Sequence, residues 1–239
     1  MLSAKTYRKR QPRLVFIGFI LLFVAFVRGV FFVQSYDMGY DDESMVSVSM
    51  VESDWADDYA AFNDETSLFL SDNGIDTPLY LQTNEQWADD YYGLDGSQTM
   101  AENGCGIASL AMVASSISGD EILPPEVSDW AGDNYYAAGQ GTQWQIFSDF
   151  AAAYGYQYQD LGTNLDRVSS YLTADHPVIV SVGPGSFTDT GHIMVLARLQ
   201  DEQVIVLDPN DSPEKYHYDT YFTLDEIADQ SLRFWTLSL

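Results

Sequence analysis

The spacing of apolar residues changes along the chain, from a helical period in its middle part to short β-type runs in its last quarter. Between residues 103 and 118, Ile107, Leu110 and Ala111 recur at three- and four-residue intervals, which predicts a buried helix that ends at Gly119. Three further helices are predicted: from Pro125 onward, over 144–154 and over 165–174. Runs rich in β-branched residues and bounded by Gly, Pro and Asp predict four strands, at 177–183, 192–199, 203–209 and 233–239.

Helices that precede a mainly antiparallel sheet define an α+β fold, and the folded domain is predicted to occupy residues 77–239. It is expected to open with a short strand at 78–82, followed by a loop in which Trp87 is buried. Thr142 is expected to cap the helix over 144–154.

Residues 14–33 form a run of 20 residues that carries one charge, Arg28, and follows a basic cluster. The run is long enough to span a bilayer core, and the basic cluster favours a cytoplasmic N-terminus. Residues 1–33 are therefore predicted to be a cytoplasmic basic tip and a transmembrane signal-anchor, with the C-terminal domain outside the cell membrane. Arg28 also leaves only 14 apolar residues before it, a length typical of a cleaved signal peptide, so secretion after cleavage is the alternative.

Charge is divided unevenly along the chain. The first 33 residues hold six of the ten Lys and Arg residues and no acid, so the remainder carries all 36 Asp and Glu residues. A domain this acidic repels the phosphate backbone, which excludes nucleic acid as a partner. Residues 34–76 are rich in Asp, Glu and Ser without a sustained apolar period, and are predicted to be an acidic extracellular stalk with one short helix near 57–62.

Cys105 is the only cysteine in the chain and lies between two glycines at the start of the first predicted helix. The unpaired N–H groups and the dipole at a helix N-terminus favour a thiolate, which is the nucleophilic form of cysteine. A lone cysteine in an exported protein cannot form an internal disulfide, so it is either reactive or paired between molecules. Cys105 is therefore the candidate nucleophile, against the alternative of a small buried apolar residue.

Of the three histidines, His192 has the placement expected of a catalytic base. It follows a glycine-rich loop and opens an apolar strand, which fixes its backbone and exposes its ring at the sheet edge. His176 and His217 are interpreted as structural or exposed. Asp208 closes the strand that should pair with the one His192 opens, so its carboxylate can orient the imidazole. The two side chains share a face of the sheet only if the hairpin loop is odd or a β-bulge shifts the register.

The motifs GCGIASLAMV, GHIMVLA and VIVLDP follow one another in the order found in papain-like cysteine peptidases. Over residues 78–209 the chain resembles the bacteriocin-processing, double-glycine peptidase-like family, in its stand-alone exported form. The resemblance implies a papain-like fold and a catalytic triad of Cys105, His192 and Asp208.

The same resemblance implies an oxyanion hole, formed by the backbone N–H of Cys105 and the side-chain amide of an upstream glutamine. Gln82 matches the glutamine of the family, and Gln98 is the alternative because it is nearer to Cys105. The chain departs from the family pattern at Ile107 and Ala108, where a Pro-Thr pair is common. These positions belong to the first helical turn, so the departure affects helix entry more than chemistry.

The leading hypothesis is a membrane-anchored extracellular cysteine peptidase that acts on a peptide or protein substrate. Two alternatives stay open, a cell-wall peptidoglycan amidase or endopeptidase and a non-catalytic binding or adhesion module on the same fold. No cluster of residues has the spacing of a metal site, so neither a metal nor another cofactor is expected. The sequence predicts no oligomeric state.

Overall fold

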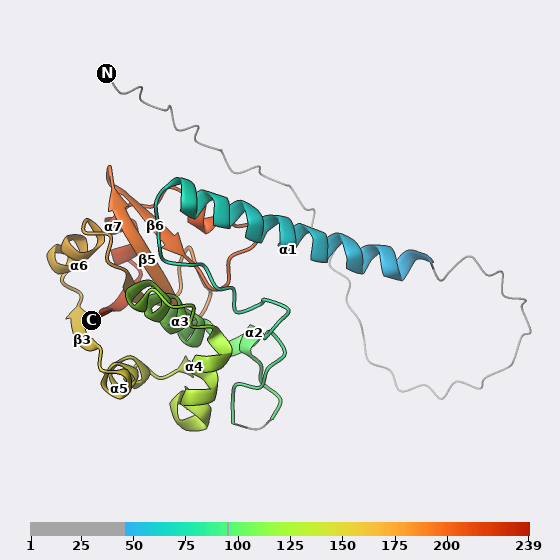
Figure 1. Cartoon of the computed structure of the whole chain (residues 1–239), viewed down its shortest axis with the longest axis horizontal. Helices are drawn as coiled ribbons and strands as arrows, with labels where there is room; N and C mark the ends of the chain where they lie inside the picture. The colour runs from blue at the N-terminus through green and yellow to red at the C-terminus, as the bar shows by residue number, and fades with distance from the viewer. Residues whose placement is uncertain (1–45, 95) are drawn as a thin grey trace, which may run out of the picture. The chain divides into compact units, whose positions relative to one another are not determined.

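The computed structural model describes residues 46–94 and 96–239, which Figure 1 draws in colour. The predicted basic tip and membrane span, residues 1–33, lie outside the described residues. Within the described ranges, no helix combines the length and the apolar character needed to cross a bilayer.

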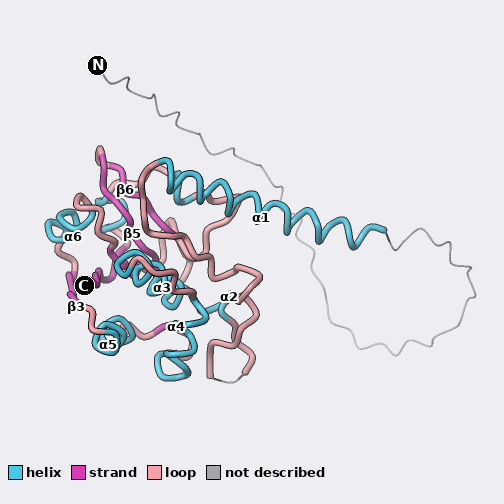
Figure 2. Tube along the Cα trace, viewed as in Figure 1, coloured by secondary structure: helices cyan, strands magenta, loops and turns pink. Residues whose placement is uncertain are grey.

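Five strands form the main sheet, in the spatial order β3-β7-β4-β5-β6, and every neighbouring pair is antiparallel (Figures 1 and 2). Their bounds are β3 (Gln157–Gly162), β4 (Val178–Val182), β5 (His192–Gln200), β6 (Gln203–Leu207) and β7 (Ser231–Ser238). β4 to β7 confirm the four predicted strands. β3 was not predicted, because only Leu161 in this edge strand is buried and the strand contains no apolar run.

Helices surround this sheet. The α-helices are α1 (Val46–Asp72), α2 (Met100–Asn103), α3 (Cys105–Ser118), α4 (Pro124–Ala131), α5 (Gln145–Tyr154), α6 (Leu165–Leu172) and α7 (Leu224–Ala228). Two short 3-10 helices, η1 (Gly132–Tyr135) and η2 (His217–Asp219), lie in connections, and β1 (Tyr136–Ala137) pairs with β2 (Gly141–Thr142) as a separate small hairpin. Helices combined with an antiparallel sheet confirm the α+β class.

The two faces of the main sheet carry separate hydrophobic cores. Along β5, Ile193 and Val195 belong to the core that contains the buried face of α3. Met194 and Leu196 belong to the other core, together with residues of α6 and α7. Because both faces of β5 are covered, the strand is apolar at nearly every position.

Two local predictions differ from the structure. Thr142 does not cap α5: Trp144 occupies the cap position, and the Thr142 hydroxyl is hydrogen-bonded to the Tyr92 hydroxyl at 3.0 Å. Residues 78–82 run without strand pairing, although the sequence predicted a strand there. The predicted end of α3 is confirmed, since Gly119 adopts the left-handed conformation with a φ of 74°.

The folded unit begins earlier than the predicted boundary at residue 77. α1 is one long helix where a solvated stalk with a single short helix was expected, and its Phe62 is only 1% exposed. The Phe62 ring meets the rings of Tyr216 and Tyr218 edge-on, with centroids 5.5 Å apart in each pair. The interpretation as a stalk is therefore wrong for the C-terminal part of α1, which packs on the domain.

Phe62→Ala should lower the free energy of unfolding by about 3–5 kcal/mol, because it removes a buried ring and leaves a cavity. Leu68→Ala is the matched control on the same helix, since Leu68 is 66% exposed. It should change the free energy by less than about 0.5 kcal/mol. Urea unfolding followed by tryptophan fluorescence measures both variants, and equal stabilities would contradict the packing of α1.

Candidate active site

Cys105 begins α3, as the sequence predicted, and its side chain is partly exposed. The flanking glycines permit close packing at this point. A Cβ on Gly104 would lie 2.5 Å from the Met100 carbonyl oxygen, and a Cβ on Gly106 would lie 2.6 Å from the Cβ of Thr142. The thiol is therefore placed at the first turn of a helix, beside backbone N–H groups that lack helical partners.

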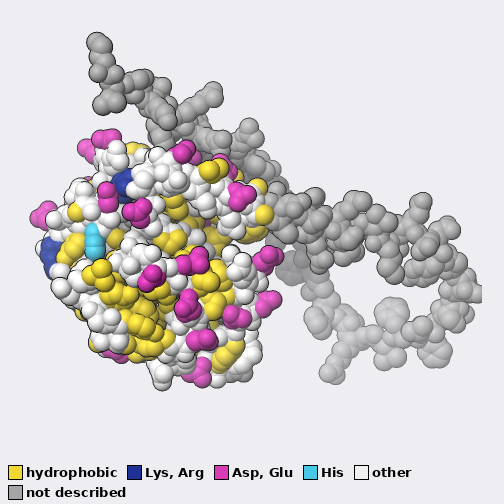
Figure 3. All heavy atoms as spheres, viewed as in Figure 1, with side chains coloured by type: hydrophobic (Ala, Val, Ile, Leu, Met, Phe, Trp, Pro, Cys, Tyr) yellow, Lys and Arg dark blue, Asp and Glu magenta, His cyan; other side chains and the backbone are white. Residues whose placement is uncertain are grey.

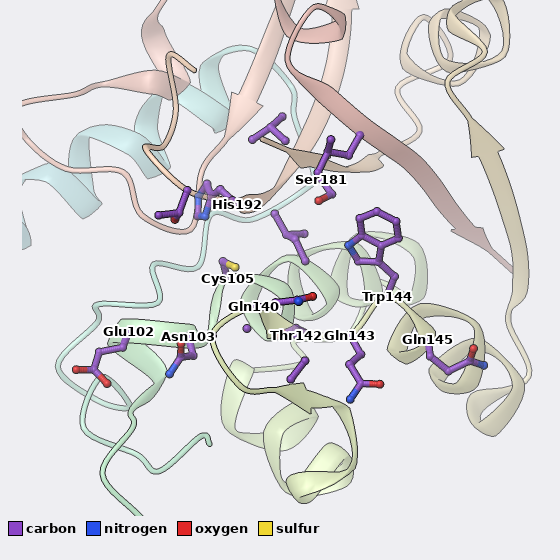
Figure 4. A pocket seen from close by; sticks show the side chains of 18 residues that line it. Glu102, Asn103, Cys105, Gln140, Thr142, Gln143, Trp144, Gln145, Ser181 and His192 are labelled. Atoms are coloured by element: carbon purple, nitrogen blue, oxygen red, sulfur yellow. The ribbon is translucent and has the colours of Figure 1, made fainter. Parts of the chain in front are cut away.

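His192 opens β5, and Asp208 holds its ring from one side. The His192 Nε2 atom and the Asp208 Oδ1 atom are 2.5 Å apart, and both residues are buried. Because Nε2 is occupied in this way, Nδ1 is the ring nitrogen left for a second partner. Figure 4 shows the His192 ring and the Cys105 sulfur beside the same cavity.

A β-bulge brings His192 and Asp208 to the same face of the sheet. A two-residue turn at 201–202 joins β5 to β6, and with regular pairing such an even loop would leave the two side chains on opposite faces. The register shifts by one residue between Leu196 and Arg198. The shift restores the common face, which is one of the two conditions that the sequence analysis required.

These side chains change one another's protonation. Burial lowers the pKa of His192, but the hydrogen bond with Asp208 and the neighbouring Cys105 side chain together raise it to about 10. Burial raises the pKa of Asp208, whereas hydrogen bonds with His192 and His217 hold the pKa well below its ordinary value. At neutral pH the site therefore contains an imidazolium beside an ionised carboxylate.

His217 also reaches the site, which its interpretation as a structural or exposed residue did not anticipate. Its Nδ1 atom lies 2.7 Å from Asp208 Oδ2, and its side chain is largely buried. The surrounding run KYHYDTY has no apolar period, so nothing in the pattern indicated this position. His176 behaves as expected of a structural histidine, because its Nε2 atom lies 2.7 Å from the carbonyl oxygen of Leu237.

Gln82 lies between the segment that follows Asp208 and α2, and it is not among the residues that line the cavity. Its backbone N–H donates to the carbonyl oxygen of Pro209 at 2.7 Å. Its side-chain Nε2 donates to the carbonyl oxygen of Ala101 at 2.6 Å, and its buried Oε1 has no hydrogen-bond partner among the described residues. The structure therefore places Gln82 next to the segment that follows Asp208, with one end of its amide unused.

Gln98, the alternative, is part of a local loop. Its Oε1 accepts a hydrogen bond from the Leu94 backbone N–H at 3.0 Å, and its backbone carbonyl accepts one from the Tyr92 N–H. Like Gln82, it is not among the residues that line the cavity. Of the two glutamines, only Gln82 makes a hydrogen bond to the segment next to Asp208.

The cavity beside Cys105 and His192 has a volume of about 830 Å³, within the range of ligand sites. One wall consists of the loop before α5, where Trp144 rests against Trp235 with ring centroids 5.1 Å apart, and the other consists of the ends of β4 and β5 (Figure 4). Glu102 is the one carboxylate among its described lining residues, and none of these is Lys or Arg. Acidic side chains are instead scattered over the outer surface (Figure 3).

No group of three or more His, Cys, Asp or Glu residues in the described part of the chain is arranged to hold a metal ion.

The chain belongs to the Peptidase_C39-like family, whose family model matches residues 75–235. This match confirms the family resemblance and, with the observed architecture, the expected papain-like α+β fold. No similar curated protein is found.

Solved structures that are similar to the chain include the following three. The peptidase domain of Streptococcus ComA, a bifunctional ABC transporter involved in quorum sensing, is 22% identical, with 57% of this chain and 91% of that chain covered and a TM-score of 0.44. A Bacillus anthracis protein assigned as a C39-like peptidase is 14% identical, with coverages of 68% and 94% and a TM-score of 0.46. A double-glycine-motif protease from an AMS/PCAT transporter, solved with its leader peptide, is 19% identical, with coverages of 56% and 82% and a TM-score of 0.42.

The pKa shifts predict how His192 and Asp208 contribute to stability at different pH values. Because the pKa of Asp208 is lowered on folding, its ionised carboxylate stabilises the folded state at pH values above the ordinary carboxyl pKa of 3.8. This stabilisation is lost as the pH falls through the folded-state pKa. The raised pKa of His192 gives a contribution that is complete below 6.5 and is lost as the pH rises toward about 10.

The wild-type protein should therefore lose stability between about pH 7 and pH 10, and His192→Asn should reduce that loss. His176→Asn is the matched control and should keep the wild-type decline. Urea unfolding at several pH values measures all three proteins. A decline of the same size in His192→Asn and in the wild type would contradict the assignment of the shift to His192.

Proposed function

We propose that this protein is a cysteine peptidase in which Cys105 is the nucleophile, His192 the general base and acid, and Asp208 the group that orients the imidazole. Membership of the family supports the peptidase class. The observation that supports these residue roles most strongly is the 2.5 Å hydrogen bond between His192 and Asp208, at the edge of a cavity that Cys105 also lines.

In this proposal the imidazolium of His192 stabilises Cys105 as a thiolate. The thiolate attacks the carbonyl carbon of the scissile peptide bond, which forms a C–S bond and turns the carbonyl oxygen into an oxyanion. His192 gives its proton to the amine as the C–N bond breaks, and a thioester remains. The neutral imidazole then takes a proton from water as the water oxygen attacks the thioester. The C–S bond breaks, the carboxylic acid product is released, and the Cys105 thiolate and the His192 imidazolium are regenerated.

The oxyanion hole in this mechanism consists of the Cys105 backbone N–H and the side chain of Gln82. An amide nitrogen carries two hydrogens, and the Ala101 carbonyl uses one of those on Gln82, so the second can serve an oxyanion. The bond from the Gln82 backbone to Pro209 fixes this residue relative to Asp208. Gln98 is less suited, because its side chain is used to close a loop.

Cys105→Ala and His192→Ala should each remove nearly all peptide hydrolysis, because they delete the nucleophile and the proton carrier. Cys105→Ala should change the free energy of unfolding by no more than about 1 kcal/mol, because Cys105 is partly exposed. His192→Ala should lower it by about 3–5 kcal/mol, because it takes a hydrogen-bond partner from the buried Asp208 carboxylate. Thermal unfolding checks that each variant is folded. His176→Ala is the matched control and should keep wild-type turnover. Hydrolysis is measured against a diverse peptide library, and alkylation of Cys105 by iodoacetamide is measured in parallel.

Full turnover in either site variant would contradict the proposed function. Cleavage of purified peptidoglycan, without cleavage of peptides, would favour the amidase or endopeptidase alternative. A Cys105 that does not react with iodoacetamide at neutral pH would favour the non-catalytic binding module.

We also propose that residues 14–33 anchor the protein in the cell membrane, with the domain outside the cell. The length of the apolar run and the basic residues before it support this location. A peptide or protein outside the cell is then the substrate.

The mature protein should retain residues 14–33, because no strong small-residue cleavage site follows them. Intact-mass analysis of the protein recovered from the membrane fraction measures the N-terminus. A mature N-terminus near residue 36 would contradict the anchor and support the secreted alternative.

A further inference from the structure

The carboxylate of Asp208 is shared by two histidines. Its Oδ1 atom is 2.5 Å from His192 Nε2, and its Oδ2 atom is 2.7 Å from His217 Nδ1. All three residues are buried. The proposed mechanism uses His192 and Asp208 but assigns no part to His217.

We propose that His217 is a positioning residue, which acts through Asp208 on the pair formed by His192 and Cys105. This inference rests on the proposed function of that pair. A carboxylate held by one oxygen can rotate about its side-chain bond, whereas a donor on each oxygen fixes its plane. The second donor also offsets part of the carboxylate's negative charge, so less of that charge opposes a thiolate at Cys105.

The surroundings of His217 hold its ring in place. The backbone N–H groups of His217 and Tyr218 donate to the two oxygens of Asp211 at 3.0 and 3.2 Å. Phe187 and Phe222 meet the His217 ring edge-on, at centroid distances of 5.2 and 5.8 Å. The ring is therefore fixed by hydrogen bonds on its backbone and by apolar contacts on its sides.

Asp211 is the second buried carboxylate of this cluster. It is 1% exposed, and burial is the largest of the effects that raise its pKa. The titratable groups that act on His217 are thus Asp208 and Asp211, with His192 across the Asp208 carboxylate. On the α1 side, Glu65 is hydrogen-bonded to the Tyr216 hydroxyl. These contacts keep His217 in position as the second donor to Asp208.

Two substitutions separate a positioning role from a merely structural one. His217→Phe removes the donor and keeps a ring among the neighbouring aromatic side chains. His217→Asn keeps an N–H donor at a similar distance from the backbone. His176→Phe is the matched control, since His176 is a partly buried histidine bonded to a backbone carbonyl of β7. Thermal unfolding checks that each full-length variant is folded.

The rate of Cys105 alkylation by iodoacetamide is measured against pH, together with kcat and KM for a cleaved peptide. In His217→Phe the midpoint of the alkylation profile should rise by about 0.5–1 pH unit, because the Asp208 charge is less offset and disfavours the thiolate. The value of kcat should fall about tenfold with little change in KM. In His217→Asn the alkylation midpoint and kcat should both return most of the way to their wild-type values. His176→Phe should match the wild type in both measurements.

A folded His217→Phe variant with the wild-type alkylation profile, and with kcat within about twofold of the wild type, would overturn the inference and leave His217 a structural residue. Alkylation needs no peptide substrate, so the two proposals can fail separately. A wild type that cleaves no peptide contradicts the proposed function, while a shifted alkylation profile in His217→Phe would still support the coupling of His217 to Cys105.

Discussion

The burial of the Asp208 carboxylate is the constraint on which the arrangement of the site depends. A charge with no exposed surface is tolerated only when hydrogen bonds replace its lost hydration. Asp208 Oδ1 accepts hydrogen bonds from His192 and from the backbone N–H of Asn210, and Oδ2 accepts one from His217. These partners come from the start of β5, from the turn after β6 and from η2. Satisfying one carboxylate therefore determines the relative positions of three segments that are separate in the sequence.

The sequence predicts the elements that carry Cys105 and His192 because both residues stand at the ends of strongly apolar segments. It could not predict the β-bulge that aligns His192 with Asp208. Alternation of apolar and polar residues sets a register only where one face of a strand is solvated. β5 is buried on both faces, so a shift of one residue between β5 and β6 would leave no apolar side chain obviously misplaced. The hydrogen bond between His192 and Asp208 forms only in the register with the bulge, and the pattern of apolar residues does not distinguish that register from the regular one.

The elements that the sequence missed are stabilised by tertiary contacts instead of by their own pattern. In β3 only Leu161 is buried, so the strand is stabilised mainly by its backbone hydrogen bonds with β7. α1 lies in an acidic stretch, yet it places Phe62 against two tyrosines that flank His217. The backbone of His217 in turn depends on the buried Asp211. Such contacts join residues far apart in the chain, so no local window of sequence reports them.

The large negative charge of the chain has little bearing on protonation inside the site. Charges on a solvated surface are screened beyond about 8 Å at physiological ionic strength, and among the described residues that line the cavity Glu102 is the one carboxylate. The groups that raise the pKa of His192 are its immediate neighbours Asp208 and Cys105, chiefly through hydrogen bonds, and not the many acids of the outer surface. The net charge of −26 therefore bears on which molecules approach the domain. Groups within hydrogen-bonding distance decide the charge state of His192.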